Sequence, residues 1–244
     1  MYKFNVVAHR GASRYAVDNT LASFALAKKH GATMIETDIR RSADDRPVVF
    51  HDAVISVPNF GLQRIDHMSL ASIQATSLAE QEFVPAWEDV LALCISLDMG
   101  IYVEIKDASP TILTEIIGTI RDAGWLERSV LFGPRPDHVF AAKRLEPKLT
   151  TGYSYRDARM DPIALARACE CNALNLAWED YPDPCSLITQ GWLERVRGAG
   201  LRLMSWHEER VSVLEQLVTI GIEDICTNDP LTASRLVLEN TVQR

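Results

Sequence analysis

Two short apolar stretches of the sequence carry carboxylates at alternate positions. Glu36 and Asp38 lie in MIETDI, and Glu104 lies in IYVEIK between Tyr102 and Lys106. Successive side chains of a β-strand point to opposite faces, so Glu36 and Asp38 share one face, and Glu104 shares a face with its two polar neighbours. If the two strands are adjacent, about 4.8 Å apart, the three carboxylates can converge on one point.

Three carboxylates in a poorly hydrated cavity would repel one another, and a divalent cation would remove that repulsion. A set of oxygen ligands favours a hard ion, so we expect Mg²⁺ or Ca²⁺ rather than zinc, with Mn²⁺ as a further option. The alternative is a network of ion pairs in which Arg10, Arg40 and Lys106 neutralise the carboxylates.

Two histidines follow apolar stretches and are expected near the same place. His9 ends NVVAH, and His51 precedes Asp52 at the end of RPVVFHD. Two imidazoles at one site can act as general acid and general base, and the alternative is a structural role for each. We expect Asp52 to orient His51 or to cap the following turn. The sequence does not assign the acid and base roles between the two histidines.

Two cations accompany these residues in the sequence. Arg10 follows His9 directly, and Lys106 stands two residues after Glu104. Beside a metal ion they would bind an anion, for which phosphate is the natural candidate. Arg10 could equally form an ion pair with Asp18 or Asp52.

Strand-like apolar runs alternate with helix-like segments along the whole chain. The runs are NVVAH, TMIETDI, IYVEIK, SVLFG, LTTGYSY, ALNLAW, LRLMSW and EDICTN. Eight strand–helix pairs in 244 residues predict an α/β fold, the (β/α)8 TIM barrel, more readily than a doubly wound open sheet. The carboxyl ends of barrel strands carry the catalytic residues of such enzymes, and the candidate residues stand at those ends.

One segment, about residues 53–85, interrupts this alternation between the second strand and the second helix. It contains proline, glycine and polar residues, including SVPNFGLQRIDHMSL. We interpret it as a small insertion over the barrel mouth, so that residues 1–244 form a single domain.

The composition limits the possible partners and the compartment. The formal net charge of −8 disfavours binding of nucleic acid. No apolar run approaches the roughly 18 residues of a membrane span, so we expect no stable membrane anchor. Five cysteines without CxxC spacing suggest reduced core thiols, and the first strand begins close to Met1, so we expect a cytoplasmic protein. The oligomeric state is left open.

The candidate residues together resemble a known family. HRG from His9, DNT from Asp18, ETD from Glu36, HD from His51 and EIK from Glu104 are similar, in order and spacing, to the motifs of glycerophosphodiester phosphodiesterases. Weaker similarities continue through HMSLASIQ, VPAWEDVLAL, Trp206 and TNDP, so the resemblance spans nearly the whole chain.

The resemblance implies a function and a role for each residue. It implies metal-dependent hydrolysis of glycerophosphodiesters, small-molecule substrates, to sn-glycerol 3-phosphate and an alcohol. It implies a divalent ion on Glu36, Asp38 and Glu104, with the histidines as the acid/base pair. It implies phosphate contacts from residues matching Arg10 and Lys106. Trp206 would form an apolar wall of the substrate pocket.

The sequence departs from the family pattern mainly at the rim of the expected site. Asp18 stands where the family has glutamate. The aspartate side chain is one methylene shorter, so in a supporting role it would reach less far. The residues after Trp206 read His207-Glu208-Glu209 in place of threonine, an aliphatic residue and asparagine. Asn228 stands where aspartate is common, and VPNFGLQR replaces the usual Thr-Thr-x-Gly turn. The identity of the alcohol therefore stays open.

Three other functions are compatible with parts of this pattern. A phospholipid-cleaving barrel that forms a cyclic phosphate would share the histidines and carboxylates, although such enzymes usually carry disulfides. A non-catalytic barrel that binds a phosphorylated ligand would not need both histidines. A metal-dependent sugar isomerase would not need Arg10 and Lys106 beside the metal.

Overall fold

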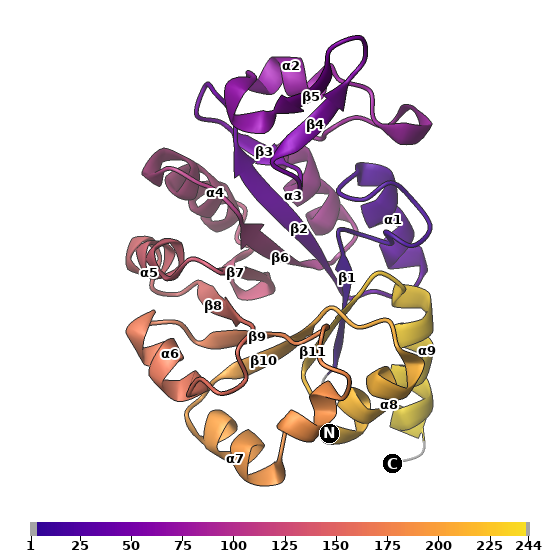
Figure 1. The fold of residues 1–244 in the computed structure, drawn as a ribbon, viewed down its shortest axis with the longest axis vertical. Helices are drawn as coiled ribbons and strands as arrows, with labels where there is room; N and C mark the ends of the chain where they lie inside the picture. Colours follow the sequence, from indigo (N-terminus) through magenta and orange to yellow (C-terminus); the bar gives the residue numbers. More distant parts are fainter. Residues whose placement is uncertain (1–3, 243–244) are drawn as a thin grey trace.

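The computed structural model describes residues 4–242 and contains a closed barrel of parallel strands (Figure 1). The sheet runs in the order β1, β11, β10, β9, β8, β7, β6, β2, and pairing of β1 with β2 closes it. This confirms the predicted (β/α)8 fold. The barrel strands are β1 (Asn5–His9), β2 (Met34–Arg41), β6 (Gly100–Ile105), β7 (Ser129–Gly133), β8 (Thr150–Tyr155), β9 (Ala173–Ala177), β10 (Arg202–Trp206) and β11 (Asp224–Thr227).

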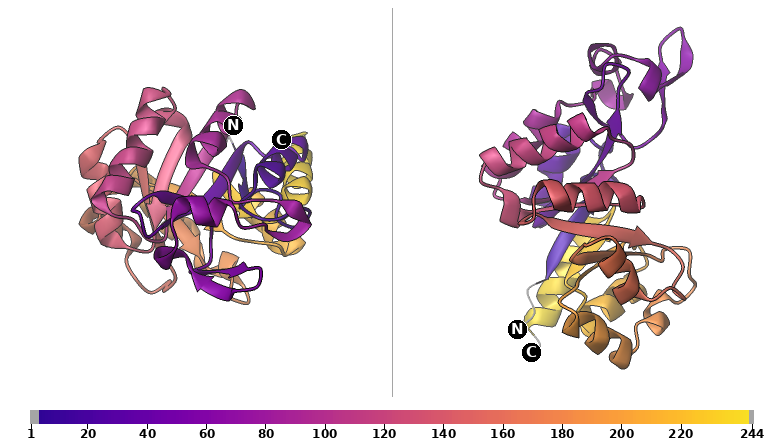
Figure 2. Two further views of the ribbon diagram at one scale, coloured as in Figure 1. Left: turned by 90° about the horizontal axis from the view of Figure 1, so that it is seen from above. Right: turned by 90° about the vertical axis from the view of Figure 1, so that its left-hand side faces the viewer.

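Helices surround the strands, as the view from above shows (Figure 2). They are α1 (Leu21–Lys29), α3 (Trp87–Ser96), α4 (Pro110–Asp122), α5 (Pro136–Leu145), α6 (Pro162–Ala168), α7 (Gln190–Gly198), α8 (Val211–Ile220) and α9 (Pro230–Val242), with the short 3₁₀ helices η3 (Leu126–Arg128) and η4 (Pro184–Leu187). None of the helices in residues 4–242 is long and apolar enough to cross a bilayer.

Local sequence explains where these helices begin and end. Thr20 caps α1 by accepting a hydrogen bond from the backbone of Ser23, whose side chain returns the interaction. Ser109 caps α4 by accepting a hydrogen bond from the backbone N–H of Ile112, and Pro110 fits the first turn because its missing N–H needs no partner there. Gly221 ends α8 at φ 86°, a left-handed conformation that glycine adopts without steric cost.

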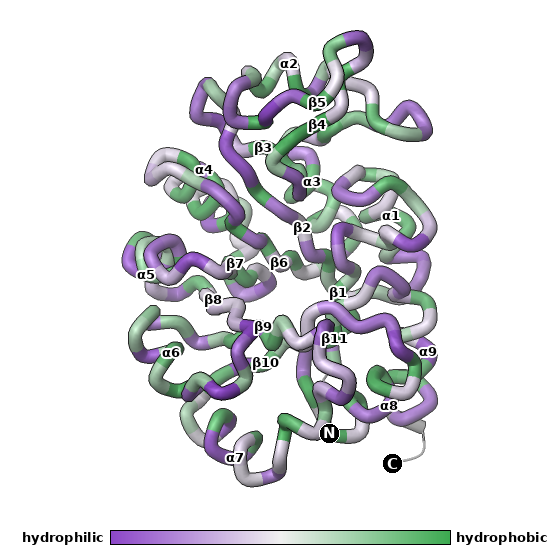
Figure 3. The backbone as a smooth tube through the Cα atoms, viewed as in Figure 1, coloured by the Kyte–Doolittle hydropathy of each residue, from purple (hydrophilic) through white to green (hydrophobic). Residues whose placement is uncertain are grey.

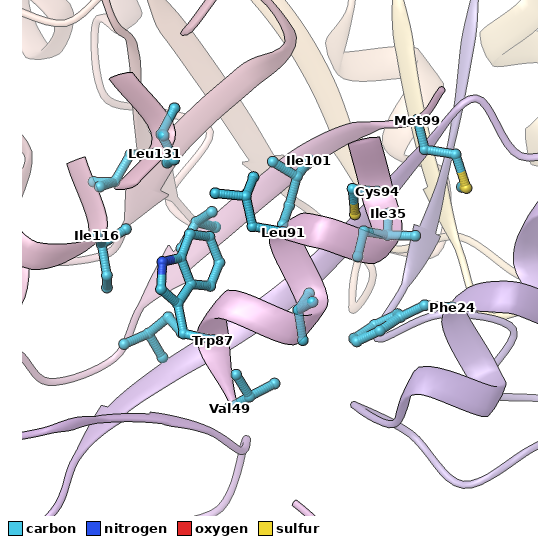
Figure 4. Close-up of a cluster of buried hydrophobic side chains, with 14 of the residues drawn as sticks. Phe24, Ile35, Val49, Trp87, Leu91, Cys94, Met99, Ile101, Ile116 and Leu131 are labelled. Atoms are coloured by element: carbon cyan, nitrogen blue, oxygen red, sulfur yellow. The ribbon is translucent and has the colours of Figure 1, made fainter. Parts of the chain in front are cut away.

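The main hydrophobic core lies between the strands and the helix layer. On β2 and β6, Ile35 and Ile101 are fully buried beside Trp87 and Leu91 of α3 (Figure 4). Ile35 and Ile101 belong to the apolar sides of β2 and β6, and the other sides of these strands carry the carboxylates. Burial of the apolar faces therefore fixes the register of β2 and β6 and turns the carboxylates into the barrel.

A polar cluster closes the amino-terminal end of the barrel interior. Asp224 is fully buried and accepts hydrogen bonds from Asn5, Tyr102 and Arg202. The Arg202 guanidinium pairs with its carboxylate, so the charge of Asp224 has a partner at this end of the barrel.

All five cysteines are buried and free.

The segment between β2 and α3 forms the expected insertion. It contains β3 (Pro47–Val49), β4 (Val54–Val57), β5 (Gly61–Arg64), η1 (Ile65–His67), α2 (Leu70–Gln74) and η2 (Ala79–Gln81). β3 pairs antiparallel with β2. Hydrophilic and hydrophobic residues are interspersed along the insertion (Figure 3). It has a small core of Val48, Ile55, Ile65, Ile73 and Val84, and it lies at the end of the molecule opposite the termini (Figure 2).

Candidate active site

Strand register brings the three carboxylates to one place. β2 and β6 pair in parallel with Asp38 opposite Glu104, and Glu36 lies two residues earlier on the same face of β2. Glu36 and Asp38 are fully buried, and Glu104 is 1% exposed. Each offers an oxygen within 4.8 Å of the oxygens of the other two. The convergence predicted from the period-two pattern is therefore present.

Two cations partly neutralise this acidic triad, by which we mean Glu36, Asp38 and Glu104. Lys106 Nζ lies 2.7 Å from Glu104 and 3.3 Å from Asp38, and Arg10 Nε lies 3.3 Å from Asp38. The backbone N–H of Arg10 donates to Glu36 over 3.1 Å. If all three carboxyls are ionised, these two cations leave one negative charge unneutralised.

The triad keeps oxygens that the described residues do not hydrogen-bond. Glu36 Oε1, Asp38 Oδ1 and Glu104 Oε2 are buried without a hydrogen bond of acceptable geometry, although Lys106 lies close to the last two. Buried carboxylate oxygens are normally satisfied, so these three fit a cation held between them. Ion pairing, the alternative to a metal, is present but incomplete. Arg40, the third cation expected in that network, donates instead to the backbone carbonyl oxygen of His51.

Burial and mutual repulsion disfavour the ionised forms of two of these carboxyls. The pKa of Glu36 is raised well above its usual range by burial and by the charges of Asp38 and Glu104. Burial also raises the pKa of Glu104 to about 7, against the opposing effect of Lys106. A proton or a metal ion is therefore needed to stabilise the folded site near neutral pH.

Asn19 is a member of the site whose role the sequence did not indicate. It is 2% exposed and donates from Nδ2 to Asp38 over 2.9 Å, while its Oδ1 accepts from Thr37 Oγ1. Its φ of 55° lies in the left-handed region, which asparagine tolerates better than most residues. Asparagine tolerates this conformation, and its amide both donates and accepts hydrogen bonds. These two properties of the asparagine in DNT could have indicated its place in the site.

His9 lies at the carboxyl end of β1, beside the triad. Its Nε2 is 3.8 Å from Glu36, and its Nδ1 is 2.8 Å from the side-chain oxygen of Asn228. The residue is 3% exposed. Burial, followed by the charges of Arg10 and His207, lowers its pKa well below 6.5, so the imidazole is neutral at pH 7.

His51 follows β3 and is more open to solvent than His9. Its Nδ1 lies 2.7 Å from the carboxylate of Asp52, a contact through which Asp52 can orient the imidazole. The side chain is 31% exposed. Burial lowers the pKa of His51, and this effect outweighs the charge of Asp38, which raises the same pKa. The charge of Asp38 acts on His51 because this histidine lies near the triad.

Two cavities flank the triad and open at the mouth. One, of about 660 Å³, is lined by Arg10, Ser13, Asp18, Glu209 and Asn228, among others. The other, of about 310 Å³, is lined by Glu104, Lys106, Tyr155, Arg156 and Trp206, among others. Open space therefore adjoins the triad beside Arg10 and beside Glu104.

The remaining candidates lie around these cavities. Trp206 is 7% exposed, and the Lys106 ammonium lies 5.3 Å from the centre of its ring. Asp18 is 45% exposed at the rim, 3.4 Å from the Arg10 guanidinium. Arg10 therefore contacts Asp18, as one alternative predicted, and also reaches Asp38.

Comparison with known proteins finds a matching family profile and relatives that align over most of their length. The profile of the "Glycerophosphoryl diester phosphodiesterase family" matches residues 9–232. A glycerophosphodiester phosphodiesterase of Caldanaerobacter subterraneus is 27% identical over 95% of this chain and 97% of its own. A probable glycerophosphodiester phosphodiesterase 2 of Mycobacterium tuberculosis is 32% identical over 91% of this chain and 86% of its own.

Solved structures show the same fold. A glycerophosphodiester phosphodiesterase from Agrobacterium tumefaciens superposes with a TM-score of 0.80 at 22% identity, covering 95% of this chain and 99% of that one. An Oleispira antarctica phosphodiesterase, solved in complex with the product sn-glycerol-3-phosphate, superposes with a TM-score of 0.79 at 22% identity, covering 96% of both chains. With the profile match over nearly the full length, the chain belongs to the glycerophosphoryl diester phosphodiesterase family.

Proposed function

We propose that this protein hydrolyses glycerophosphodiesters to sn-glycerol 3-phosphate and an alcohol, and that it needs one divalent cation to do so. The observation that carries the proposal is the acidic triad with Arg10 and Lys106 beside it and His9 at its edge. The names of the full-length relatives support the same substrate class.

Glu36, Asp38 and Glu104 would hold the cation. Their converging oxygens and their deficit of positive charge support this assignment. The all-oxygen ligand set favours Mg²⁺ or Ca²⁺, with Mn²⁺ as a further candidate. When bound, the ion would supply positive charge that stabilises the oxygens of the reacting phosphate.

Arg10 and Lys106 would bind the phosphate. A phosphodiester is an anion, and negative charge builds on its oxygens during displacement, so fixed cations at the site lower the barrier. Both side chains already contact the triad, which holds them close to the place where the phosphate would bind.

His9 and His51 would move the two protons of the reaction. One accepts a proton as a water oxygen attacks phosphorus, and the other donates a proton to the alcohol oxygen as its bond to phosphorus breaks. His9 is neutral and buried beside Glu36, whereas His51 is paired with Asp52 at the rim. Asp18 and Asp52 would then act as supporting residues for Arg10 and His51.

The two cavities would receive the two substituents of the phosphate. Trp206 would provide an apolar wall in the smaller one, where Lys106 also lies. We further propose that residues 1–244 act as a single cytoplasmic domain that uses a small-molecule substrate and binds no nucleic acid. The acidic charge and the five free, buried cysteines support this.

A panel of glycerophosphodiesters tests the proposal. Purified protein is stripped of metal and assayed with Mg²⁺, Mn²⁺ or Ca²⁺, and the products are followed by ³¹P NMR. We expect sn-glycerol 3-phosphate with at least one ion and none after addition of EDTA. A cyclic phosphate as the final product would indicate the phospholipid-cleaving type of chemistry. Binding without turnover would indicate a ligand-binding barrel.

A further inference from the structure

His9 belongs to a closed ring of contacts with three residues from other strand ends. The His9 ring stacks on that of His207, with centres 4.5 Å apart and planes 19° from parallel. His207 Nδ1 lies 3.4 Å from Glu209 Oε1, a close approach without hydrogen-bond geometry. Glu209 Oε1 accepts a 2.7 Å hydrogen bond from the Asn228 backbone N–H. The Asn228 side-chain oxygen returns to His9 Nδ1 over 2.8 Å.

This closed set of contacts joins the ends of paired strands, which makes it rigid. β1 pairs with β11 and β10 pairs with β11, so the segments that carry His9, His207 and Asn228 are neighbours. The backbone N–H of Glu208 donates to Cys226 over 2.9 Å and fastens the loop after β10 to β11. Thr227 Oγ1 donates to the second oxygen of Glu209, so that carboxylate is fixed from two sides.

These contacts restrict the two movements open to the His9 side chain. The bond to Asn228 fixes the direction of Nδ1, and the stack on His207 fixes the plane of the ring. Trp206 meets another side of the ring edge-on, with centres 5.5 Å apart. Nε2 is therefore held toward Glu36, at 3.8 Å. A misplacement of about 1 Å in a reacting group can cost about 10²-fold in rate.

We propose that His207 is a positioning residue for His9, and that Glu209 holds His207 in place. This inference rests on the proposed function, because it assigns His9 a part in the reaction. His207 acts through its flat ring, which covers the face of His9, and its own proton is not needed.

The proposal is tested with His207→Ala and His207→Phe. The alanine variant loses the stack, and we expect kcat to fall by roughly 10²-fold with little change in KM or in Mn²⁺ affinity. The phenylalanine variant keeps a flat ring, and we expect it to stay within a few-fold of the wild type. His67→Phe changes an exposed histidine of the insertion and serves as the matched control.

The kinetic outcomes separate the possible roles. Equal losses in the alanine and phenylalanine variants would overturn the proposal, because the imidazole itself would then be required. A rise in KM alone would also overturn it and would place His207 in substrate binding. If His207→Ala does not fold, Glu209→Ala removes the support of the stacked ring, and a loss of kcat is again expected.

A chemical readout tests the positioning without any substrate. Trypsin cleavage after Lys3 and Arg10 yields a peptide, residues 4–10, in which His9 is the only histidine. We expect diethyl pyrocarbonate to label His9 slowly in the wild type and in His207→Phe, and clearly faster in His207→Ala. Equal labelling in all three would contradict the proposal. An inactive wild type would refute the proposed function and leave this readout valid.

Discussion

Asn19 and Asp38 form a hydrogen bond inside the barrel mouth, with Asn19 Nδ2 2.9 Å from Asp38 Oδ2. Asn19 Oδ1 is fixed by Thr37 Oγ1 at 2.8 Å and by the backbone N–H of Asp38 at 3.3 Å. The amide therefore leaves Asp38 little freedom to rotate, while Oδ1 of that carboxylate lies 3.3 Å from Lys106 Nζ without a hydrogen bond. Groups that orient metal ligands in this way commonly tune affinity.

Replacement of Asn19 by alanine should weaken metal binding about 10–100-fold, because Asp38 loses the group that orients it. Titration with Mn²⁺, followed by electron paramagnetic resonance or calorimetry, measures the effect. Because alanine also strains the left-handed backbone at φ 55°, Asn19→Gly is the matched control, and it should lose the same affinity with a smaller loss of thermal stability. Unchanged affinity in both variants would contradict the role given to Asn19.

Replacement of Glu36 by glutamine should abolish activity and metal binding without destabilising the metal-free protein. Its carboxylate is fully buried beside two others, so removal of its charge relieves repulsion. Thermal melting in EDTA and Mn²⁺ titration check both statements. Glu88→Gln on α3, an exposed position, should match the wild type in every assay. A variant at Glu36 that binds Mn²⁺ with wild-type affinity would exclude this residue as a ligand.

The metal-free protein should lose stability as pH rises through about 7. Glu104 has its folded pKa raised from 4.5 to about 7, so its contribution is fully present below 4.5 and is lost as the buried group ionises. Metal binding should show the opposite trend and tighten up to about pH 7, because the ion competes with the proton. Melting curves of wild type and Glu104→Gln in EDTA, compared from pH 5 to 8, measure the first effect. A constant difference between the two proteins would contradict it.

His9→Ala and His51→Ala should each lower kcat by about 10²–10⁴-fold, because each removes one proton transfer. A substrate with a weakly basic leaving group, such as a p-nitrophenyl ester, needs no proton on departure. It should therefore restore much of the activity of the variant that lacks the acid, and of that variant only. Recovery of both variants, or of neither, would contradict a division of labour between the two histidines.

The parts of the site that follow strand periodicity could be predicted from the sequence. Glu36 and Asp38 alternate with Ile35 and Ile39, which are fully buried in the outer core. The apolar side of β2 thus determines where the polar side points, and the same holds for Glu104 on β6. The alternation of eight apolar runs with helix-like segments was similarly sufficient to predict the barrel.

The parts that depend on closure of the barrel could not be predicted. His9 and Asn228 are 219 residues apart in sequence and meet because β11 returns to pair with β1. No local pattern encodes the stack of His207 on His9. The sequence showed only that the residues after Trp206 differ from the family pattern, and the structure shows two of them, His207 and Glu209, in contact around His9.

Titration of metal-free protein with Mn²⁺ shows whether hydrolysis requires one cation on the acidic triad. Bound metal and the rate of glycerophosphodiester hydrolysis are measured in the same samples, with Glu104→Gln in parallel. We expect the rate to rise with occupancy, to reach its plateau at one ion per chain, and to stay at background in the variant. Hydrolysis at the full rate in metal-free protein, or by Glu104→Gln, would contradict that requirement.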